Sequence, residues 1–186
     1  MPDSKKSFLR QFLKEKKMVG SMIPSSRFLA RKMLSSVDFA VSRVFVELGP
    51  GNGVFTKLVL EQMSADSKLY VFELNDMFFK VLKAEITDPR VVLIHDSAEK
   101  IGEYLKRDGL TSADVVLSSL PLANFSTGLK AKILSECYNI LREAGIYVQF
   151  QYSLNAKKAI KAIFKNIRIT FTPANFPPAF VYICKK

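Results

Sequence analysis

Residues 46–56 read Val-Glu-Leu-Gly-Pro-Gly-Asn-Gly-Val-Phe-Thr, and this stretch decides the fold. An apolar run leads into an acidic residue, glycines then stand at alternate positions, and a helix-like segment follows. This order predicts a strand, a tight turn and the first turn of a helix. Glycines at such a turn let the backbone approach a ligand where any Cβ would collide. The glycines concerned are Gly49, Gly51 and Gly53.

The spacing of these glycines separates two classes of nucleotide binder. Dinucleotide-binding proteins use G-x-G-x-x-G, whereas here Gly53 comes one residue early and Val54 stands at the place of their last glycine. The pattern E-x-G-x-G-x-G, which begins at Glu47, is typical of S-adenosylmethionine (AdoMet) methyltransferases. It predicts AdoMet as the cofactor and S-adenosylhomocysteine as its product, and it disfavours a nicotinamide. An ordinary strand–turn–helix is the alternative, against which the companion residues described below argue.

Composition narrows the class of protein. The chain has 186 residues, 48% of them hydrophobic, which suits one globular domain with a proper core. Its net charge of +11 favours an anionic partner, either nucleic acid or an anionic membrane surface. No apolar run approaches the roughly 18–20 residues that span a bilayer, and the basic N-terminus lacks the apolar region of a signal peptide. Cys137 and Cys184 lie among apolar neighbours, so we expect buried free thiols, a reducing cytoplasmic setting and no metal site.

Strand-like and helical segments alternate after residue 40. We expect strands at residues 43–47, 69–73, 91–95, 113–119, 146–152, 167–172 and 179–184, and helices at 54–63, 77–86, 98–107, 128–141 and 156–164. This alternation indicates an α/β fold with a parallel sheet and helices on both faces. The loop between the last two strands is too short for a crossover helix, so we expect an antiparallel hairpin at one edge. The predicted fold is the seven-stranded, Rossmann-like sheet of class I AdoMet-dependent methyltransferases.

An N-terminal helical extension at residues 1–36 stands apart from the methyltransferase domain predicted at residues 37–186. Its first part carries an apolar stripe inside a collar of six basic residues. The stripe consists of Phe8, Leu9, Phe12 and Leu13. Such a helix is suited to lie in the headgroup plane of a membrane, where each basic residue contributes on the order of 1 kcal/mol near an anionic leaflet. Packing of the stripe on the domain is the alternative. A second helix is expected from Ser25 or Ser26 to Leu34.

Polar residues after the other strands complete the predicted cofactor site, because ligands of open α/β sheets bind beyond the carboxyl ends of the strands. Glu73 ends the second strand, 20 residues after Gly53, and a carboxylate there suits both ribose hydroxyls. Asp96 follows the third strand and suits the adenine amino group, with a helix N-cap as its alternative role. Glu47 is placed to orient the glycine turn or the methionine ammonium. The remaining predicted cofactor contacts are Leu74, Ser97, Ala98 and Ser118.

The segment after the fourth strand, residues 118–125, is expected to face the donor methyl group. It contains no acid, so no general base is obvious there, and positioning and desolvation of an amine should dominate catalysis. The residues expected to orient the acceptor amine are Ser119, Leu120, Tyr152 and Gln149. Core packing is the alternative role of Tyr152.

The first motif resembles that of the rRNA adenine dimethylases, which share its form E-x-G-P-G-x-G-x-x-T. Those enzymes carry Asn-Leu-Pro-Tyr after the fourth strand, which implies an amide that holds the adenine amine and a ring that stacks on the base. This chain has Ser119-Leu120-Pro121-Leu122 instead. Both the amide and the ring are missing, and stacking is a main source of single-base recognition in RNA.

A second resemblance, to bacterial phospholipid N-methyltransferases of the soluble, membrane-associating type, covers nearly the whole chain. Its pieces are residues 8–13, 19–20, 23–27, 29–31, 46–56, 118–122, 124–125, 149–150, 152 and 177–179. It implies stepwise methylation of phosphatidylethanolamine toward phosphatidylcholine by a cytoplasmic protein held peripherally at the inner face of the membrane. A phospholipid and an anionic membrane surface are then the expected partners. Gln151, Ser153 and Asn175-Phe176 depart from that family's pattern, which leaves the headgroup and the number of methylations open.

The sequence leaves two other functions open. One is methylation of RNA or of another small substrate, against which the altered segment at residues 119–122 argues. The other is a non-catalytic, basic binding module with the same fold. The retained glycine turn, together with Glu73 and Asp96, argues against such a loss of the site.

Overall fold

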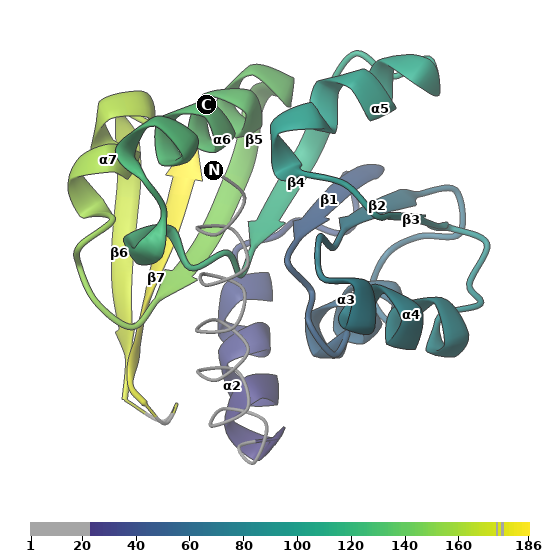
Figure 1. Cartoon of the computed structure of the whole chain (residues 1–186), viewed down its shortest axis with the longest axis horizontal. Coiled ribbons are helices and arrows are strands. Elements are labelled where there is room, and N and C mark those ends of the chain that lie inside the picture. Colours follow the sequence, from purple (N-terminus) through teal and green to yellow (C-terminus); the bar gives the residue numbers. More distant parts are fainter. Residues whose placement is uncertain (1–22, 174, 176) are drawn as a thin grey trace.

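The computed structural model describes residues 23–173, 175 and 177–186, and in this part of the chain seven strands form one sheet (Figure 1). The order across the sheet is β3-β2-β1-β4-β5-β7-β6. Strands β1 to β5 run parallel, and β7 lies antiparallel between β5 and β6. The seven-stranded Rossmann-like fold and its antiparallel hairpin are thus confirmed.

The elements follow the predicted alternation. The strands are β1 (Val44–Leu48), β2 (Lys68–Phe72), β3 (Val91–Ile94), β4 (Ala113–Ser118), β5 (Leu141–Gln151), β6 (Asn166–Thr172) and β7 (Ala179–Lys185). The α-helices are α2 (Ile23–Leu34), α3 (Val54–Leu60), α4 (Asp76–Glu85), α5 (Ile101–Arg107), α6 (Thr127–Ile140) and α7 (Lys157–Ile163). Two short 3₁₀ helices, η1 (Ala98–Lys100) and η2 (Leu122–Asn124), precede α5 and α6.

The sheet is covered by helices on both faces, and each face has its own apolar core. Successive strand residues point to opposite faces, so Val46 packs with α5, α6 and α7 while its neighbour Phe45 packs with α2 and α3. This is why the central strands read as continuous apolar runs. Cys137 and Cys184 are buried and free, as predicted, and burial raises the pKa of both thiols, that of Cys184 to about 12.

Helix α2 confirms the second helix predicted in the N-terminal extension. Its buried residues fall at i, i+1, i+4 and i+5 and therefore share one face, which packs with α3, β5 and β7. These residues are Leu29, Ala30, Met33 and Leu34. The apolar stripe at residues 8–13 lies outside the described residues, so the predicted membrane helix remains a prediction.

Two elements, the helix predicted at residues 98–107 and strand β5, differ most from the prediction. The helix expected at residues 98–107 divides, because Ser97 caps a 3₁₀ turn with a hydrogen bond from the Glu99 N–H before α5 begins. Strand β5 begins at Leu141 rather than Ile146. Leu141 already pairs with Ala113, and the ladder then shifts register around Ala144, whose φ is +63°.

Candidate active site

The site residues predicted from sequence lie at or just after the carboxyl ends of five adjacent parallel strands, β3, β2, β1, β4 and β5. Ladder hydrogen bonds continue one residue beyond these ends and fix the residues relative to one another. The N–H groups of Gly49, Glu73 and Ser119 donate to the carbonyls of Phe72, Ile94 and Leu48 at 2.9, 3.0 and 2.9 Å. The order of strands reverses between β1 and β4, the point at which open α/β sheets bind their ligands.

The glycine turn joins β1 to α3 in a backbone conformation that favours glycine. Gly49, Gly51 and Gly53 have φ values of +67°, +62° and +75°, in the left-handed region that L side chains seldom occupy. A Cβ on Gly49 would lie 3.0 Å from Leu120 Cδ2, and one on Gly53 would lie 2.9 Å from Leu82 Cδ2. The turn therefore contacts the segment after β4 on one side and α4 on the other.

Glu73 is buried beside this turn, with 4% of its surface exposed. Its Oε2 accepts a hydrogen bond from the Gly51 N–H at 3.2 Å, and its Oε1 accepts one from the Asn75 N–H at 2.8 Å. Each carboxylate oxygen can accept a further bond, so the group suits a pair of vicinal hydroxyls. Leu74, the next residue, is 61% exposed and offers an apolar surface there.

Glu47 holds the start of α3 against the end of β1. The Thr56 hydroxyl donates a hydrogen bond to Glu47 Oε2 at 2.7 Å, and both side chains are buried. This contact gives Glu47 a role in orienting the glycine turn. Thr56 was not among the predicted site residues, although a threonine nine residues after the motif acid was the available signal.

Asp96 carries a network of its own after β3. Its Oδ2 accepts hydrogen bonds from Lys100 Nζ at 2.9 Å and from the Tyr104 hydroxyl at 3.0 Å, and its Oδ1 accepts one from the Ser97 N–H at 2.7 Å. The Lys100 ammonium is the largest cause that lowers the pKa of Asp96. The cap of the following 3₁₀ turn is Ser97, which leaves Asp96 as an ionised acceptor beside the buried Ala98.

The segment after β4 is fixed by two glutamine amides from β5. Gln149 Nε2 and Gln151 Nε2 both donate to the Leu120 carbonyl oxygen, at 3.1 and 2.8 Å. Gln151 Oε1 accepts from the Ala123 N–H at 3.3 Å, and Gln149 Oε1 accepts from the Tyr147 hydroxyl at 2.7 Å. Both glutamines are buried. The Leu122 N–H also donates to this oxygen at 2.9 Å, so the Leu120 carbonyl has three donors from the protein itself.

Gln149 thus holds the loop from β5, and its predicted role in orienting the acceptor amine remains a proposal. Gln151, which the sequence marked only as a departure from a family pattern, holds the same carbonyl. The signal for it was a second polar side chain, beside Gln149, in the apolar run at residues 146–151. Buried Ser118 lies under the same loop, where its Oγ accepts from the Leu120 N–H at 3.4 Å, and Ser119 is half-buried.

Tyr152 follows β5 at the open edge of the site. Its ring packs edge-on against Phe150 with centroids 5.5 Å apart, and Phe150 stacks on Phe55 of α3 at 6.0 Å. Tyr152 is 42% exposed, and burial of its hydroxyl end raises its pKa. A partly exposed ring at this edge has a face available to an alkylammonium group.

Comparison with known proteins shows which family the chain belongs to. The model of the family described as "Ribosomal RNA adenine dimethylase" matches residues 3–165. The chain belongs to this family. An ornithine lipid N-methyltransferase from Singulisphaera acidiphila is 26% identical over 180 residues, which cover 96% of this chain and 94% of that protein.

Solved structures show the same fold. A 1,6-didemethyltoxoflavin-N1-methyltransferase from Burkholderia thailandensis, solved with S-adenosylhomocysteine, has a TM-score of 0.72 at 15% identity and covers 100% of this chain and 90% of its own. The N-methyltransferase NodS from Bradyrhizobium japonicum, also with S-adenosylhomocysteine, has a TM-score of 0.69 at 10% identity over 88% of each chain.

This member of the family is an AdoMet-dependent methyltransferase. The residues present fit the cofactor, because the glycine turn has the left-handed backbone conformation at all three glycines and buried Glu73 turns its carboxylate toward the same turn. The individual assignments remain proposals: Glu73 for the ribose, Asp96 for the adenine amine, and Leu74, Ser97 and Ala98 beside the base. Among the described helices, none is both long and apolar enough to cross a bilayer.

Proposed function

We propose that this protein transfers methyl groups from AdoMet to the amine of a membrane-lipid headgroup, phosphatidylethanolamine being the headgroup expected from the sequence. The observation that carries the proposal is that hydrogen-bond donors of the protein already occupy the Leu120 carbonyl oxygen. Two buried amides, from Gln149 and Gln151, already donate to it. A carbonyl in this state is a poor acceptor for the amino group of a base, and residues 119–122 supply neither a side-chain amide nor an aromatic ring.

The extent of the alignment with the ornithine lipid N-methyltransferase supports the same class of substrate. The ornithine lipid N-methyltransferase aligns over nearly all of both chains. Ornithine lipids and phosphatidylethanolamine share a feature, an amine joined to an anionic group beside acyl chains. We therefore propose a zwitterionic amino lipid as the acceptor, and the two lipids as the first substrates to compare.

The transfer itself is an in-line displacement. The unprotonated amine nitrogen attacks the sulfonium methyl carbon, the C–N bond forms, and the C–S bond breaks with its electron pair going to sulfur. The sulfur leaves as a neutral thioether, so the reaction needs no acid at the leaving group. The new ammonium releases its proton to water at the open edge, where Tyr152 is exposed. The protein contributes position and exclusion of water.

The place of action follows from the charge and the N-terminal extension. We propose that residues 1–36 form a membrane-binding cap on the methyltransferase domain at residues 37–186. The protein would then work in the cytoplasm, peripherally bound to the inner face of the membrane. Deletion of residues 2–18 should weaken sedimentation with anionic liposomes, and equal sedimentation of the truncated protein would exclude this cap.

RNA is the second candidate acceptor, because the family description names ribosomal RNA adenine. Incubation with labelled AdoMet separates the two. Vesicles that contain phosphatidylethanolamine or ornithine lipid should take up the label, whereas ribosomal RNA stripped of its methyl groups should not. Transfer to RNA alone would replace the lipid proposal.

A further inference from the structure

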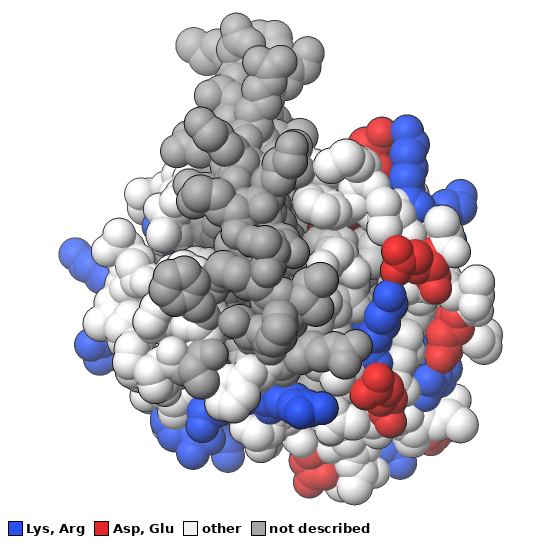
Figure 2. All heavy atoms as spheres, turned by 90° about the horizontal axis from the view of Figure 1, so that it is seen from below, with Lys and Arg blue, Asp and Glu red and all other residues white. Residues whose placement is uncertain are grey.

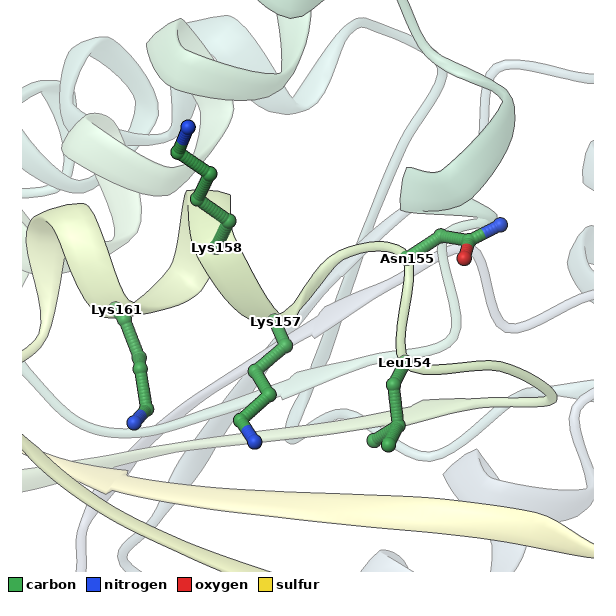
Figure 3. A pocket seen from close by; sticks show the side chains of 5 residues that line it. All are labelled: Leu154, Asn155, Lys157, Lys158 and Lys161. Carbon is green, nitrogen blue, oxygen red and sulfur yellow. The ribbon is translucent and has the colours of Figure 1, made fainter.

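A hollow of about 400 Å³ lies directly after the carboxyl end of β5, and its lining is basic. It is formed by Leu154, Asn155, Lys157, Lys158 and Lys161 (Figure 3). Figure 3 shows the side chains of Lys157, Lys161 and Leu154 pointing to the same side, whereas Lys158 points the other way. The spacing explains the pair, since residues at i and i+4 share a face of α7.

The frame of this hollow is fixed by the fold. Ala156, Ile160 and Phe164 are fully buried and fix the orientation of α7. The turn before the helix is held by hydrogen bonds from the Lys157 N–H to the Leu154 carbonyl at 2.9 Å and from the Tyr182 hydroxyl to the Ser153 carbonyl at 3.5 Å. The two ammonium groups are therefore carried on a fixed scaffold.

No carboxylate competes for these ammonium groups in the described part of the chain. Lys157 and Lys161 are exposed and take part in none of the ion pairs found there. Residues 144–186 contain seven Lys and Arg residues and no Asp or Glu. Glu136, the acid of the neighbouring helix α6, instead accepts a hydrogen bond from the Gly102 N–H of α5 at 2.8 Å. Figure 2, which shows the molecule from below, has the same asymmetry of charge. Asp and Glu gather at the right of this view, and only Lys and Arg are coloured at its left.

A residue that holds the loop after β4 is close in the chain to the hollow. Gln151, which bonds to Leu120 and Ala123 of that loop, is three residues before Leu154. Tyr152 lies between them and is exposed at the same edge. An amino lipid whose amine lies at Leu120 would therefore extend its anionic group toward α7. Leu154, 43% exposed, offers an apolar contact beside the two charges.

We propose that Lys157 and Lys161 bind the anionic group of the amino-lipid substrate, with Leu154 against its glycerol or acyl portion. This inference rests on the proposed lipid function and adds the part of the site that selects a zwitterionic headgroup. The group bound is a phosphate diester in phosphatidylethanolamine or a carboxylate in an ornithine lipid. Because the amine and the anionic group would bind at separate places, the distance between them would decide which amino lipids are substrates.

The test compares two double variants of the full chain with equal charge. Lys157→Gln/Lys161→Gln removes the proposed site, and Lys165→Gln/Arg168→Gln removes two other exposed basic residues that do not line the hollow. Methyl transfer is measured on mixed micelles of phosphatidylethanolamine, of ornithine lipid, and of an amino lipid with a neutral ether spacer in place of the anion. AdoMet affinity is measured in parallel.

The site variant should raise KM for one or both zwitterionic lipids by about tenfold, with kcat and AdoMet affinity within about twofold of wild type. KM for the neutral-spacer lipid should not change, and the control variant should resemble wild type. A rise in KM for phosphatidylethanolamine would identify the bound group as a phosphate, and a rise in KM for the ornithine lipid would identify it as a carboxylate. Equal effects of both variants would overturn the site in favour of uniform attraction to the surface. If wild type methylates no amino lipid, the proposed function itself fails.

Discussion

The Gln151 side-chain amide donates to the Leu120 backbone carbonyl at 2.8 Å, and this bond ties the end of β5 to the loop after β4 that we propose faces the donor methyl. Gln149 reaches the same oxygen from two residues earlier in the strand. Both amides lie on one face of β5 because side chains alternate along a strand. The two amides therefore hold the loop against β5.

Replacement of Gln151 by Leu should therefore disturb the acceptor loop and spare the cofactor. Loss of a buried amide–carbonyl bond costs about 1–3 kcal/mol, so we expect kcat to fall about tenfold, with the AdoMet dissociation constant within about twofold of wild type. Gln62→Leu is the matched control, because Gln62 also donates its amide to a backbone carbonyl, that of Leu58 at 2.9 Å, in α3 rather than in the loop. Equal losses of kcat in both variants would remove the special role of Gln151.

Replacement of Gly51 by Val should abolish AdoMet binding. Gly51 has a φ of +62° and donates its N–H to Glu73. Gly109, with a φ of +76° and no atom within 4 Å of a built Cβ, is the control for backbone strain alone. Gly109→Val should cost about 1–2 kcal/mol of stability and leave binding intact. Calorimetric titration distinguishes them, and normal binding by a folded Gly51→Val protein would contradict the cofactor site.

Replacement of Glu73 by Gln should weaken AdoMet binding by about tenfold to a hundredfold. The amide nitrogen of Gln would face a backbone N–H that the carboxylate now accepts, from either Gly51 or Asn75. Glu85→Gln removes an acid whose ion pair with Lys57 is exposed, and serves as the control. If both variants keep wild-type affinity in calorimetry, Glu73 does not hold the ribose.

The loss of folding stability at low pH should depend on Asp88. Arg90 bonds to Asp88, to the carbonyl of Leu60 at the end of α3 and to that of Met63 just beyond it, and it lowers the pKa of Asp88 from 3.8 to about 2. A folded-state pKa below the unfolded value stabilises the protein above about pH 4, and this contribution is lost as pH falls through about 2. Asp88→Asn should lower Tm at pH 7, and most of the difference should disappear by pH 2. Thermal unfolding followed by circular dichroism checks this, and a pH-independent difference would contradict it.

The sequence predicts the sheet and the cofactor turn because both depend on local pattern. Apolar runs mark β1 to β5, and the spacing of Gly49, Gly51 and Gly53 specifies the turn without knowledge of distant contacts. The early start of β5 was missed, since Leu141 pairs with Ala113 across a register shift that no local pattern encodes.

Roles that depend on contacts between distant segments were also missed. Gln151 meets Leu120 only because β5 lies beside β4 in a particular register. The unpaired state of Lys157 and Lys161 likewise follows from which helix packs beside α7. In both cases, the residue types were visible in the sequence and their partners were not.

The central claim is that the acceptor is a lipid amine, and a competition measures it most directly. Wild-type protein is incubated with labelled AdoMet, vesicles that contain phosphatidylethanolamine and ornithine lipid, and unmethylated ribosomal RNA in one reaction. After extraction, the label is counted in the organic phase and in the RNA, and the lipid product is identified by mass spectrometry. We predict label in an N-methylated lipid of the organic phase. Label in the RNA, with none in lipid, would contradict the account.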